Sequence, residues 1–437
     1  MLRRGLAKRN LAVITASWTM MRPFTAATRT YFALYFLELG ADPAKIGIIT
    51  MAGSATLALT RIIGGYLADA LGRKKLIVTM TMVYALASLL YAFAKSWTWL
   101  LAAEVISSAA LLYQPAIFAI MADSLPPDSR ARGISAARTI ASISSLAGPP
   151  AAALLVNSRG LVPAVRMLYI ARSAAIFLAG LGRLALVETL TTKKKVEPGS
   201  VFREYREALS WIRGDLGKLI AINSSAVAAY GLADPFIQIY AVREVGISPE
   251  AWGAVSTAVR VEALVSFLVS GYMADRLGRN ISLALAYGFS SAGLLALLAV
   301  PRGSFTAVLA SQLIYAAFAF GPARFALFAD LTPTEARGKL TAVRGLVEDG
   351  AFSLASALGG SVYSVSPFVD LGLSAIGLAL SALAALKALP RVGSIEKFSE
   401  GPESREAWHL PQRVSNQLPR NSPQRARPER LWVSQSL

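Results

Sequence analysis

The sequence contains no cysteine, and its only histidine, His409, lies in a polar C-terminal segment. The lack of cysteine excludes disulfide bonds, thiolate metal sites and cysteine nucleophiles. A single histidine outside the apolar part also excludes histidine metal clusters and a Ser-His-Asp triad within that part. We therefore expect no cofactor, no bound metal and no enzymatic activity.

Charged residues are also scarce, at 16% of the 437 residues, whereas 54% are hydrophobic. Soluble domains carry roughly a quarter charged residues. Apolar stretches of about twenty residues, long enough to cross a bilayer as helices, recur along the chain. They lack the alternation of barrel strands, so we predict an all-α polytopic membrane protein. Twelve spans are expected, at residues 11–37, 46–68, 76–95, 97–122, 134–156, 163–187, 218–242, 249–272, 281–300, 304–329, 340–364 and 367–389.

The formal net charge of +18 follows the expected topology. Basic clusters occupy alternate loops, at Arg3–Arg9, 73–75, 130–132, 193–195, 276–279 and 337–339, while the intervening loops carry few. Because cytoplasmic loops are enriched in Lys and Arg, we predict that both termini are cytoplasmic and that the plasma membrane holds the protein. The bilayer accounts for the charge, and no nucleic-acid partner is expected.

Two polar segments divide the chain. Residues 188–217 form the longest internal loop, and Phe202, Tyr205, Leu209 and Ile212 in it follow helical spacing. This spacing predicts a short helix on the membrane surface or, alternatively, a solvated linker helix. Residues 391–437 have a composition typical of disorder. The expected organisation is a six-helix bundle at 1–187, a linker at 188–217, a second bundle at 218–390 and a tail at 391–437, in a monomer.

The two expected bundles repeat each other in sequence. Gly65–Arg73 and Gly271–Arg279 share seven of nine residues at an offset of 206. Two further sets of matches follow at offsets of 207 and 206: Asp123, Pro126 and Arg130 with Asp330, Pro333 and Arg337, and Gly40, Pro43 and Gly47 with Gly246, Pro249 and Gly253. Parallel six-helix repeats with a site at their interface are a transporter design.

The repeated segment resembles a signature of the major facilitator superfamily, Gly-x-x-x-Asp-x-x-Gly-Arg-Lys, found between the second and third helices. It is complete at Gly65–Lys74 and recurs at Gly271–Arg279, where Asn280 replaces the lysine. The stretches 123–130 and 330–337 resemble the family's shorter signature. The resemblance implies a secondary transporter with a gate formed by these segments. The implied gate residues are Gly65, Asp69, Gly72, Arg73, Asp123, Arg130, Gly271, Asp275, Gly278, Arg279, Asp330 and Arg337.

The chemistry of the gate follows from its residue types. Gly65 and Gly72 have no side chain and would let a neighbouring helix approach closely. A carboxylate such as Asp69 accepts hydrogen bonds from the free N–H groups at a helix N-terminus. The resemblance places Asp69 near residues 338–341 when the cytoplasmic side is closed, and Asp275 near 132–135. The alternative is that these charges only mark topology and anchor lipid headgroups.

Polar residues inside the expected spans are candidates for a substrate site, because a charge in hydrocarbon costs at least ~2.5–3.5 kcal/mol. The offset of 206 maps Thr28 onto Asp234, so we expect Arg29 and Asp234 at similar depth on opposite sides of a pseudo-twofold axis. For each candidate the alternative is a structural ion pair. The candidates for a substrate and proton cavity are Arg22, Arg29, Glu104, Gln114, Tyr230, Asp234, Gln238, Gln312 and Tyr315.

These features predict a proton-coupled exporter of a small organic molecule. The stretch Gly148-Pro149 matches the start of the Gly-Pro-x-x-Gly-Gly pattern of exporters, although Ala152 and Ala153 replace its later glycines. Asp234 is the expected proton carrier, with Glu104 second. A proton symporter or facilitator for uptake remains an alternative, and so does a transporter-like membrane sensor.

Overall fold

The computed structural model describes residues 2–190, 209–333 and 336–391. Regular secondary structure within these ranges is helical, with no strand among them, which confirms the expected all-α class. The described residues belong to one compact unit. Residues 392–437 of the expected tail and residues 191–208 of the expected linker, which include Phe202 and Tyr205, lie outside the described residues.

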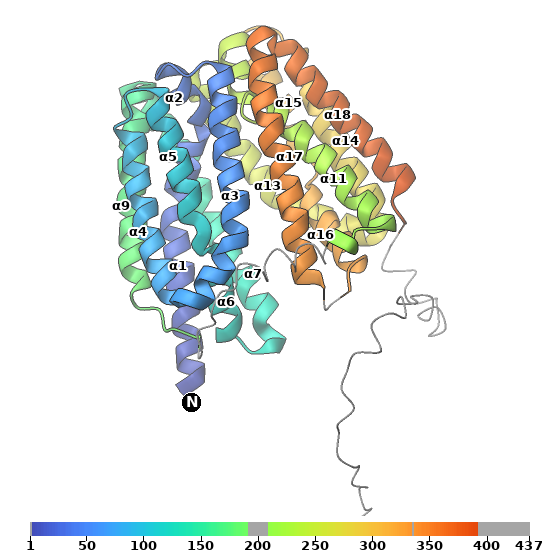
Figure 1. The fold of residues 1–437 in the computed structure, drawn as a ribbon. Helices are drawn as coiled ribbons and strands as arrows, with labels where there is room; N and C mark the ends of the chain where they lie inside the picture. Colours follow the sequence, from blue (N-terminus) through green and yellow to red (C-terminus); the bar gives the residue numbers. More distant parts are fainter. Residues whose placement is uncertain (1, 191–208, 334–335, 392–437) are drawn as a thin grey trace, which may run out of the picture. The chain divides into compact units, whose positions relative to one another are not determined.

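The first half of the chain forms a group of helices drawn in blue to green in Figure 1. They are α1 Leu2–Thr30, α2 Phe32–Glu38, α3 Pro43–Leu71, α4 Arg73–Ala92, α5 Trp97–Ala110, the 3-10 turn η1 Leu111–Tyr113, α6 Gln114–Ser124, α7 Pro127–Ser144, η2 Ser145–Ala147, α8 Gly148–Arg159 and α9 Leu161–Arg183.

The second half forms a second group beside the first, drawn in green to red (Figure 1). It contains α11 Gly214–Ala233, α12 Ile237–Ile239, the π-helical turn η3 Tyr240–Glu244, α13 Pro249–Leu277, α14 Arg279–Leu298, α15 Phe305–Ala316, α16 Phe320–Asp330, α17 Arg337–Val365 and α18 Pro367–Ala388.

Helices cover all twelve expected spans, but the spans are not equally apolar. Within the described residues nine are long and apolar enough to cross a membrane, or ten if α3, which bends by 48° between Thr60 and Ile63, counts as one span. The other two spans contain charged residues. One is formed by α1 and α2, with Arg22 and Arg29 in α1, and the other is α17, with Arg344 and Glu348. The structure therefore supports a multi-pass membrane protein, and the count of twelve spans stays a prediction.

The repeat in sequence is also a repeat in backbone conformation. Gly72 and Gly278 both have φ +96°, and Gly40 and Gly246 have φ +83° and +84°. Residues with a Cβ are strained at such angles, so glycine fixes the same two turns in both halves.

The N-termini of α3 and α13 are capped in equivalent ways. The carboxylate of Asp42 accepts a hydrogen bond of 2.8 Å from Lys45 N, and Ser248 accepts one of 3.2 Å from Ala251 N. The side chain and backbone of Lys45 both donate to Asp42 and lower the pKa of its carboxyl group. A proline follows each cap at the first helical position, where its missing N–H costs nothing.

Several spans are interrupted near their middle. Pro115 follows the turn η1 at the start of α6, and Pro322 lies in the first turn of α16 after a break at residues 317–319. Proline removes a backbone donor and ends the preceding helix. Because the two prolines match at the repeat offset, the same break occurs in both halves.

The two halves meet along two seams, α3 with α17 and α8 with α13. A Cβ at Gly47 would collide with the carbonyl oxygen of Ser356, and a Cβ at Gly253 would lie 2.5 Å from Ala153 Cβ. Ser353 Oγ donates to Met51 O at 2.8 Å across the first seam. We call the end of the bundle that contains these contacts and the turns at Gly40 and Gly246 the seam end. The end with Gly72 and Gly278 is the signature end.

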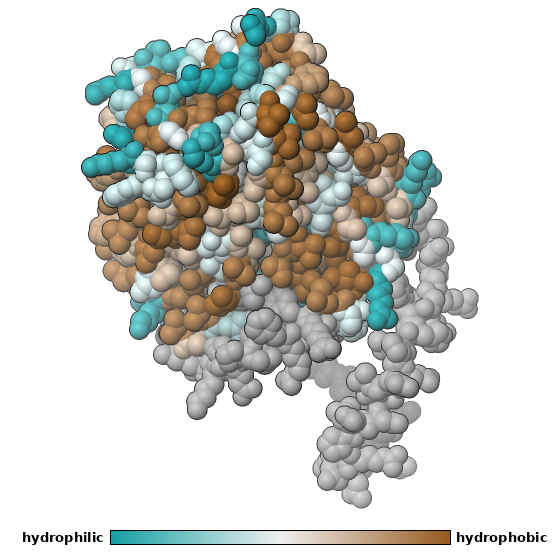
Figure 2. All heavy atoms as spheres, turned by 45° about the horizontal axis from the view of Figure 1, so that its top comes forward, coloured by the Kyte–Doolittle hydropathy of each residue, from teal (hydrophilic) through white to brown (hydrophobic). Residues whose placement is uncertain are grey.

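The outer surface is apolar over much of its area. Figure 2 shows brown, hydrophobic residues along the side of the molecule and teal, hydrophilic residues gathered at the end turned toward the viewer. The exposed large apolar side chains include Leu268 at 75% and Val365 at 88%. Such contiguous apolar exposure fits a surface in contact with lipid.

Candidate functional site

Arg29 and Asp234 form an ion pair between the two halves. Arg29 lies in the last turn of α1, and Asp234 directly follows α11, where Pro235 prevents the helix from continuing. Arg29 Nη2 lies 3.4 Å from Asp234 Oδ2, and the two side chains are 58% and 43% exposed. The pair is therefore accessible rather than locked in a dry interior.

A cavity of about 310 Å³ surrounds this pair, and we call it the central cavity. Five candidate residues from the sequence line it: Arg29, Asp234, Gln238, Gln312 and Tyr315. Its walls also include three residues that the sequence did not indicate, Thr50, Trp252 and Arg260. Because α1, α2 and α3 contribute on one side, and the segment after α11 together with α12, α13 and α15 on the other, both halves build the cavity.

A second cavity of about 160 Å³ adjoins Arg29 within the first half. We call it the tyrosine cavity, because Tyr84, Tyr91 and Tyr169 line it together with Glu104 and Arg172. Arg29 lines both cavities. Its guanidinium therefore lies where it can face either Asp234 or the polar groups of the first half.

Hydrogen bonds and ring stacking hold the tyrosine cavity together. Tyr91 donates its hydroxyl hydrogen to Glu104, and its ring stacks on Tyr169 with centroids 4.7 Å apart. Arg172 donates to the hydroxyl of Tyr84 and lies 5.1 Å from the centre of that ring. Arg172 also lies 5.7 Å from the centre of the Tyr169 ring on its own helix, α9, whereas its hydrogen-bond partner comes from α4.

Three other candidates from the sequence do not line either cavity. The hydroxyl of Tyr230 donates to Ser290 Oγ at 2.8 Å, and its ring packs against Phe320 at 5.5 Å. Arg22 donates to Ser142 Oγ at 3.1 Å, and Gln114 begins α6. Tyr230 and Arg22 make these hydrogen bonds outside the two cavities, and the assignment of all three residues to the substrate cavity stays a prediction.

At the signature end of the first half, one arginine pairs with two aspartates. Arg73, the first residue of α4, forms ion pairs with Asp123 of α6 and, at 3.6 Å, with Asp69 of α3. It also donates to Thr189 Oγ1 at 3.1 Å. The loops after α3 and α6 are thus joined to the segment that follows α9.

The second half repeats this arrangement. Arg279 forms an ion pair with Asp330 and donates to Ala326 O at 2.9 Å, and the charge of Asp275 attracts it. Arg337 donates to the carbonyl oxygens of Ala329 and Thr332 at 2.8 and 3.2 Å.

Arg130, the equivalent of Arg337 in the first half, is exposed. The expected approach of Asp69 to residues 338–341 concerns a closed signature end, whereas the seams described above close the opposite end.

The close-packing role expected of Gly65 belongs to its neighbour. No atom lies within 4 Å of a Cβ built at Gly65, whereas a Cβ at Gly64 would collide with the carbonyl oxygen of Leu112. Adjacent residues on a helix point about 100° apart, so a one-residue difference decides which glycine faces α5 and η1.

The other signature glycines have little space or moderate space around them. At Gly72 a Cβ would lie 3.2 Å from Glu188 Oε2, whose carboxylate accepts from Lys74 N at 2.9 Å. At Gly271 the nearest atom, Pro322 Cβ, would be 3.8 Å away, and at Gly278 Asn280 Oδ1 would be 3.4 Å away.

A separate buried ion cluster joins α16 to α17. Arg324 Nη1 lies 3.0 Å from Glu348 Oε2, and Arg344 Nε lies 3.8 Å from Glu348 Oε1. The side chains of all three are at most 16% exposed. One carboxylate thus lies between two buried guanidinium groups, which is the arrangement of a structural cluster.

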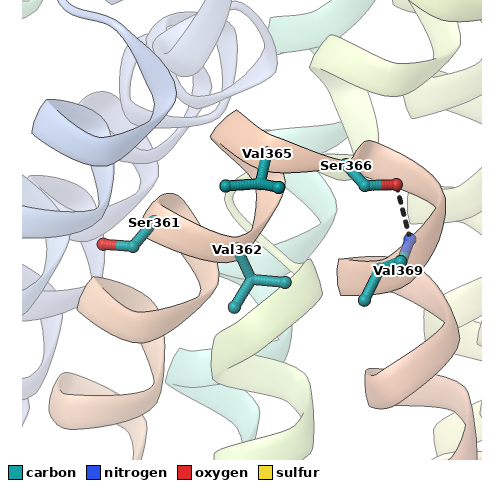
Figure 3. Close-up of a pocket in the computed structure, with 5 residues that line it drawn as sticks. All are labelled: Ser361, Val362, Val365, Ser366 and Val369. Carbon is teal, nitrogen blue, oxygen red and sulfur yellow. Dashed lines mark hydrogen bonds between the residues drawn. The ribbon is translucent and has the colours of Figure 1, made fainter.

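A further hollow, at the turn between α17 and α18, is apolar. Figure 3 shows Val362, Val365 and Val369 in its wall, with Ser361 and Ser366 beside them. Ser366 Oγ accepts a hydrogen bond of 3.3 Å from Val369 N and so caps α18. This hollow has no charged lining and offers no solute-binding chemistry comparable to the central cavity.

Among the described residues no three His, Cys, Asp or Glu side chains gather into a group that could hold a metal ion.

Comparisons with known proteins agree with this geometry. Residues 12–216 and 219–432 match the Major Facilitator Superfamily. A stretch of 93 residues is 37% identical to the niacin transporter NiaP of Acinetobacter baylyi, and it covers 21% of this chain and 21% of that protein. The match to this relative thus spans about a fifth of its length.

Solved transporters share the fold. The nucleoside transporter NupG aligns with a TM-score of 0.68 at 15% identity, over 86% of this chain and all of the other. The peptide transporter POT in complex with sulfate aligns at 0.69 and 14%, over 88% and 97%. A D-xylose-proton symporter aligns at 0.66 and 14%, over 87% and 97%.

The family match covers almost the whole chain. The chain therefore belongs to the Major Facilitator Superfamily and is a membrane transporter of small solutes.

Proposed function

We propose that the protein moves a small organic solute by alternating access, with the central cavity as its binding site and protons as the coupling ion. The observation that carries the proposal is the exposed ion pair Arg29–Asp234, which links the two halves inside a cavity that both halves build. Both termini would lie on the cytoplasmic side of the plasma membrane.

The exposure of the pair supports a switching role. Exposed ion pairs contribute only about 0–1 kcal/mol, so a solute or a proton can replace this one at little cost. Protonation of Asp234 would release Arg29, which also lines the tyrosine cavity. Arg29 stays charged at any relevant pH, so Asp234 is the group that exchanges the proton. Glu104, hydrogen-bonded to Tyr91, is the second candidate.

Export in exchange for protons is our preferred direction. The Gly148-Pro149 pair that begins α8 packs against α1, since a Cβ at Gly148 would lie 2.8 Å from Ala27 N. The exporter-like pattern thus touches the helix that carries Arg29. Uptake together with protons is the second candidate, and a stretch of the chain is similar to the niacin transporter NiaP. Niacin is accordingly the first uptake substrate to examine.

Transport in proteoliposomes tests both directions. The purified protein is reconstituted, and the movement of radiolabelled niacin and of a panel of small organic molecules is followed under pH gradients of either sign. Antiport predicts accumulation against the proton flow, symport predicts accumulation with it, and a protonophore should abolish either. If no solute responds to a gradient of either sign, proton coupling is wrong.

A further inference from the structure

The lining of the central cavity contains an arginine without an acidic partner. Arg260 of α13 lines the cavity, and none of the ion pairs formed by the described residues includes it. Arg29 acts on it as a like charge. The nearest acid in sequence, Glu262, is two positions away and therefore points to nearly the opposite side of the helix.

The charges of the lining do not cancel. Arg29, Arg260 and Asp234 are the charged residues among those that line the central cavity, which leaves an excess of one positive charge. The tyrosine cavity adds Glu104 and Arg172, so the excess over both cavities is also one. A partly buried positive charge without a counter-ion is unfavourable, and a bound anion would remove that cost.

Uncharged polar atoms in the same wall also lack partners. Gln238 and Gln312 are 9% and 4% exposed, and one amide atom of each, together with Thr50 Oγ1, makes no hydrogen bond with the described residues. All three residues line the central cavity. Buried polar groups are normally satisfied, and those that are not indicate a missing partner.

The remaining walls are apolar and define the body of that partner. Phe32, Val255, Val259 and Tyr315 line the cavity with Trp252. A volume of about 310 Å³ lies at the lower end of the range for small-molecule sites. It is far larger than an inorganic anion needs, so the wall suits an organic molecule with one charged end.

We propose that the central cavity binds a small organic monoanion, whose acidic group pairs with Arg260 while Gln238, Gln312 and Thr50 bind its polar atoms. This inference rests on the proposed function for the location of the site and adds the charge class of the solute. In this arrangement Arg29 remains free to exchange between Asp234 and the first half, because Arg260 holds the substrate.

Thermal unfolding of the purified full-length protein in detergent tests the charge class. The probes are matched acids and amides, namely benzoate with benzamide, phenylacetate with phenylacetamide and hexanoate with hexanamide, with sodium sulfate at equal ionic strength as the inorganic anion. We expect at least one acid to raise the Tm while its amide and sulfate do not. If no acid exceeds its amide, or if sulfate matches the acids, the inference is wrong.

Variants of two arginines on the same helix assign the anion to Arg260. Arg260→Gln should weaken binding of the stabilising acid about 10- to 100-fold, the usual range for losing a hydrogen bond to a charged group. Arg276→Gln removes the same charge from the last turn of α13, where Arg276 packs on Tyr272, and should leave binding unchanged. Without ligand, Arg260→Gln should not lower the Tm, whereas a purely structural arginine would.

The proteoliposome assay separates this inference from the proposed function. Acid-selective binding that depends on Arg260, without gradient-driven movement of any solute, would refute proton-coupled transport and leave the anion site standing. Gradient-driven transport of solutes that is indifferent to Arg260→Gln would uphold the proposed function and refute the anion site.

Discussion

Arg29 Nη2 lies 3.4 Å from Asp234 Oδ2, although Thr28, not Arg29, occupies the position that the repeat pairs with Asp234. The two copies of the duplication thus supply opposite charges from adjacent rather than equivalent positions. Two residues at equivalent positions of the repeats would face each other across the pseudo-twofold axis. The one-residue offset lets a base in one half meet an acid in the other.

Asp234→Asn should abolish gradient-driven transport and spare substrate binding and downhill exchange, because the amide cannot carry a proton. Initial rates in proteoliposomes, with and without a pH gradient, measure the effect. Asp215→Asn is the matched control, since Asp215 lies in the first turn of α11, the helix that ends directly before Asp234, and pairs with Lys218 at 2.8 Å. Wild-type coupling in Asp234→Asn would show that another group carries the proton.

Asp69→Asn should impair transport and leave stability nearly unchanged. In this structure Asp69 contacts only the edge of a partly exposed ion pair, 3.6 Å from Arg73, and such pairs contribute at most ~1 kcal/mol. Its larger role would come when the signature end closes and its carboxylate meets the N-terminus of α17. Asp42→Asn, at the other end of α3, is the control because asparagine also caps helices well. Transport by Asp69→Asn at the wild-type rate would contradict the gate.

Gly47→Ala should open the seam end, because the added Cβ would collide with the backbone oxygen of Ser356. The chain has no cysteine, so a single Ser256→Cys in the cavity wall can report access. Labelling by a membrane-impermeant maleimide from the seam side should rise in Gly47→Ala. Gly372→Ala, at a position with no neighbour within 4 Å of an added Cβ, should not change it. A folded Gly47→Ala protein with unchanged labelling would refute the role of this contact.

Glu348→Gln should lower the free energy of unfolding by about 3–5 kcal/mol, since it leaves Arg324 and Arg344 buried without a counter-charge. Glu38→Gln breaks the exposed pair with Arg243 and should cost no more than about 1 kcal/mol. Thermal unfolding in detergent compares the two variants. Equal shifts would mean that the α16–α17 cluster is hydrated and not structural.

The sequence was sufficient for the helices and the repeat because their causes are local. Apolar runs of membrane length require helices, and a glycine such as Gly72 or Gly278 marks a turn that other residues enter only with strain. The duplication offset also predicts that Arg29 and Asp234 lie at the same depth. Each of these inferences needs only positions along the chain.

The residues that were missed depend on how helices rotate against one another. Arg260 and Arg172 each read as a lone charge in a span, and nothing local indicates that one faces a cavity and the other Tyr84. Arg22 and Arg29 share a helical face in sequence, yet Pro23 inside α1 and the packing of α7 direct Arg22 to Ser142. The orphan amides of Gln238 and Gln312 become visible only when their neighbours are placed.

The same close helix–helix contact occurs twice in the molecule, once in each seam, and the two contacts differ by one methyl group. Gly47 and Gly253 are repeat equivalents, and so are their partners, Gly360 on α17 and Ala153 on α8, at an offset of 207. One joint is glycine against glycine, and the other carries a methyl group in the contact. The exporter pattern would have a glycine at position 153, so this chain differs from it at the joint itself. Exchanging the two residues, with Ala153→Gly and Gly360→Ala, would transfer the tighter joint from one side of the molecule to the other.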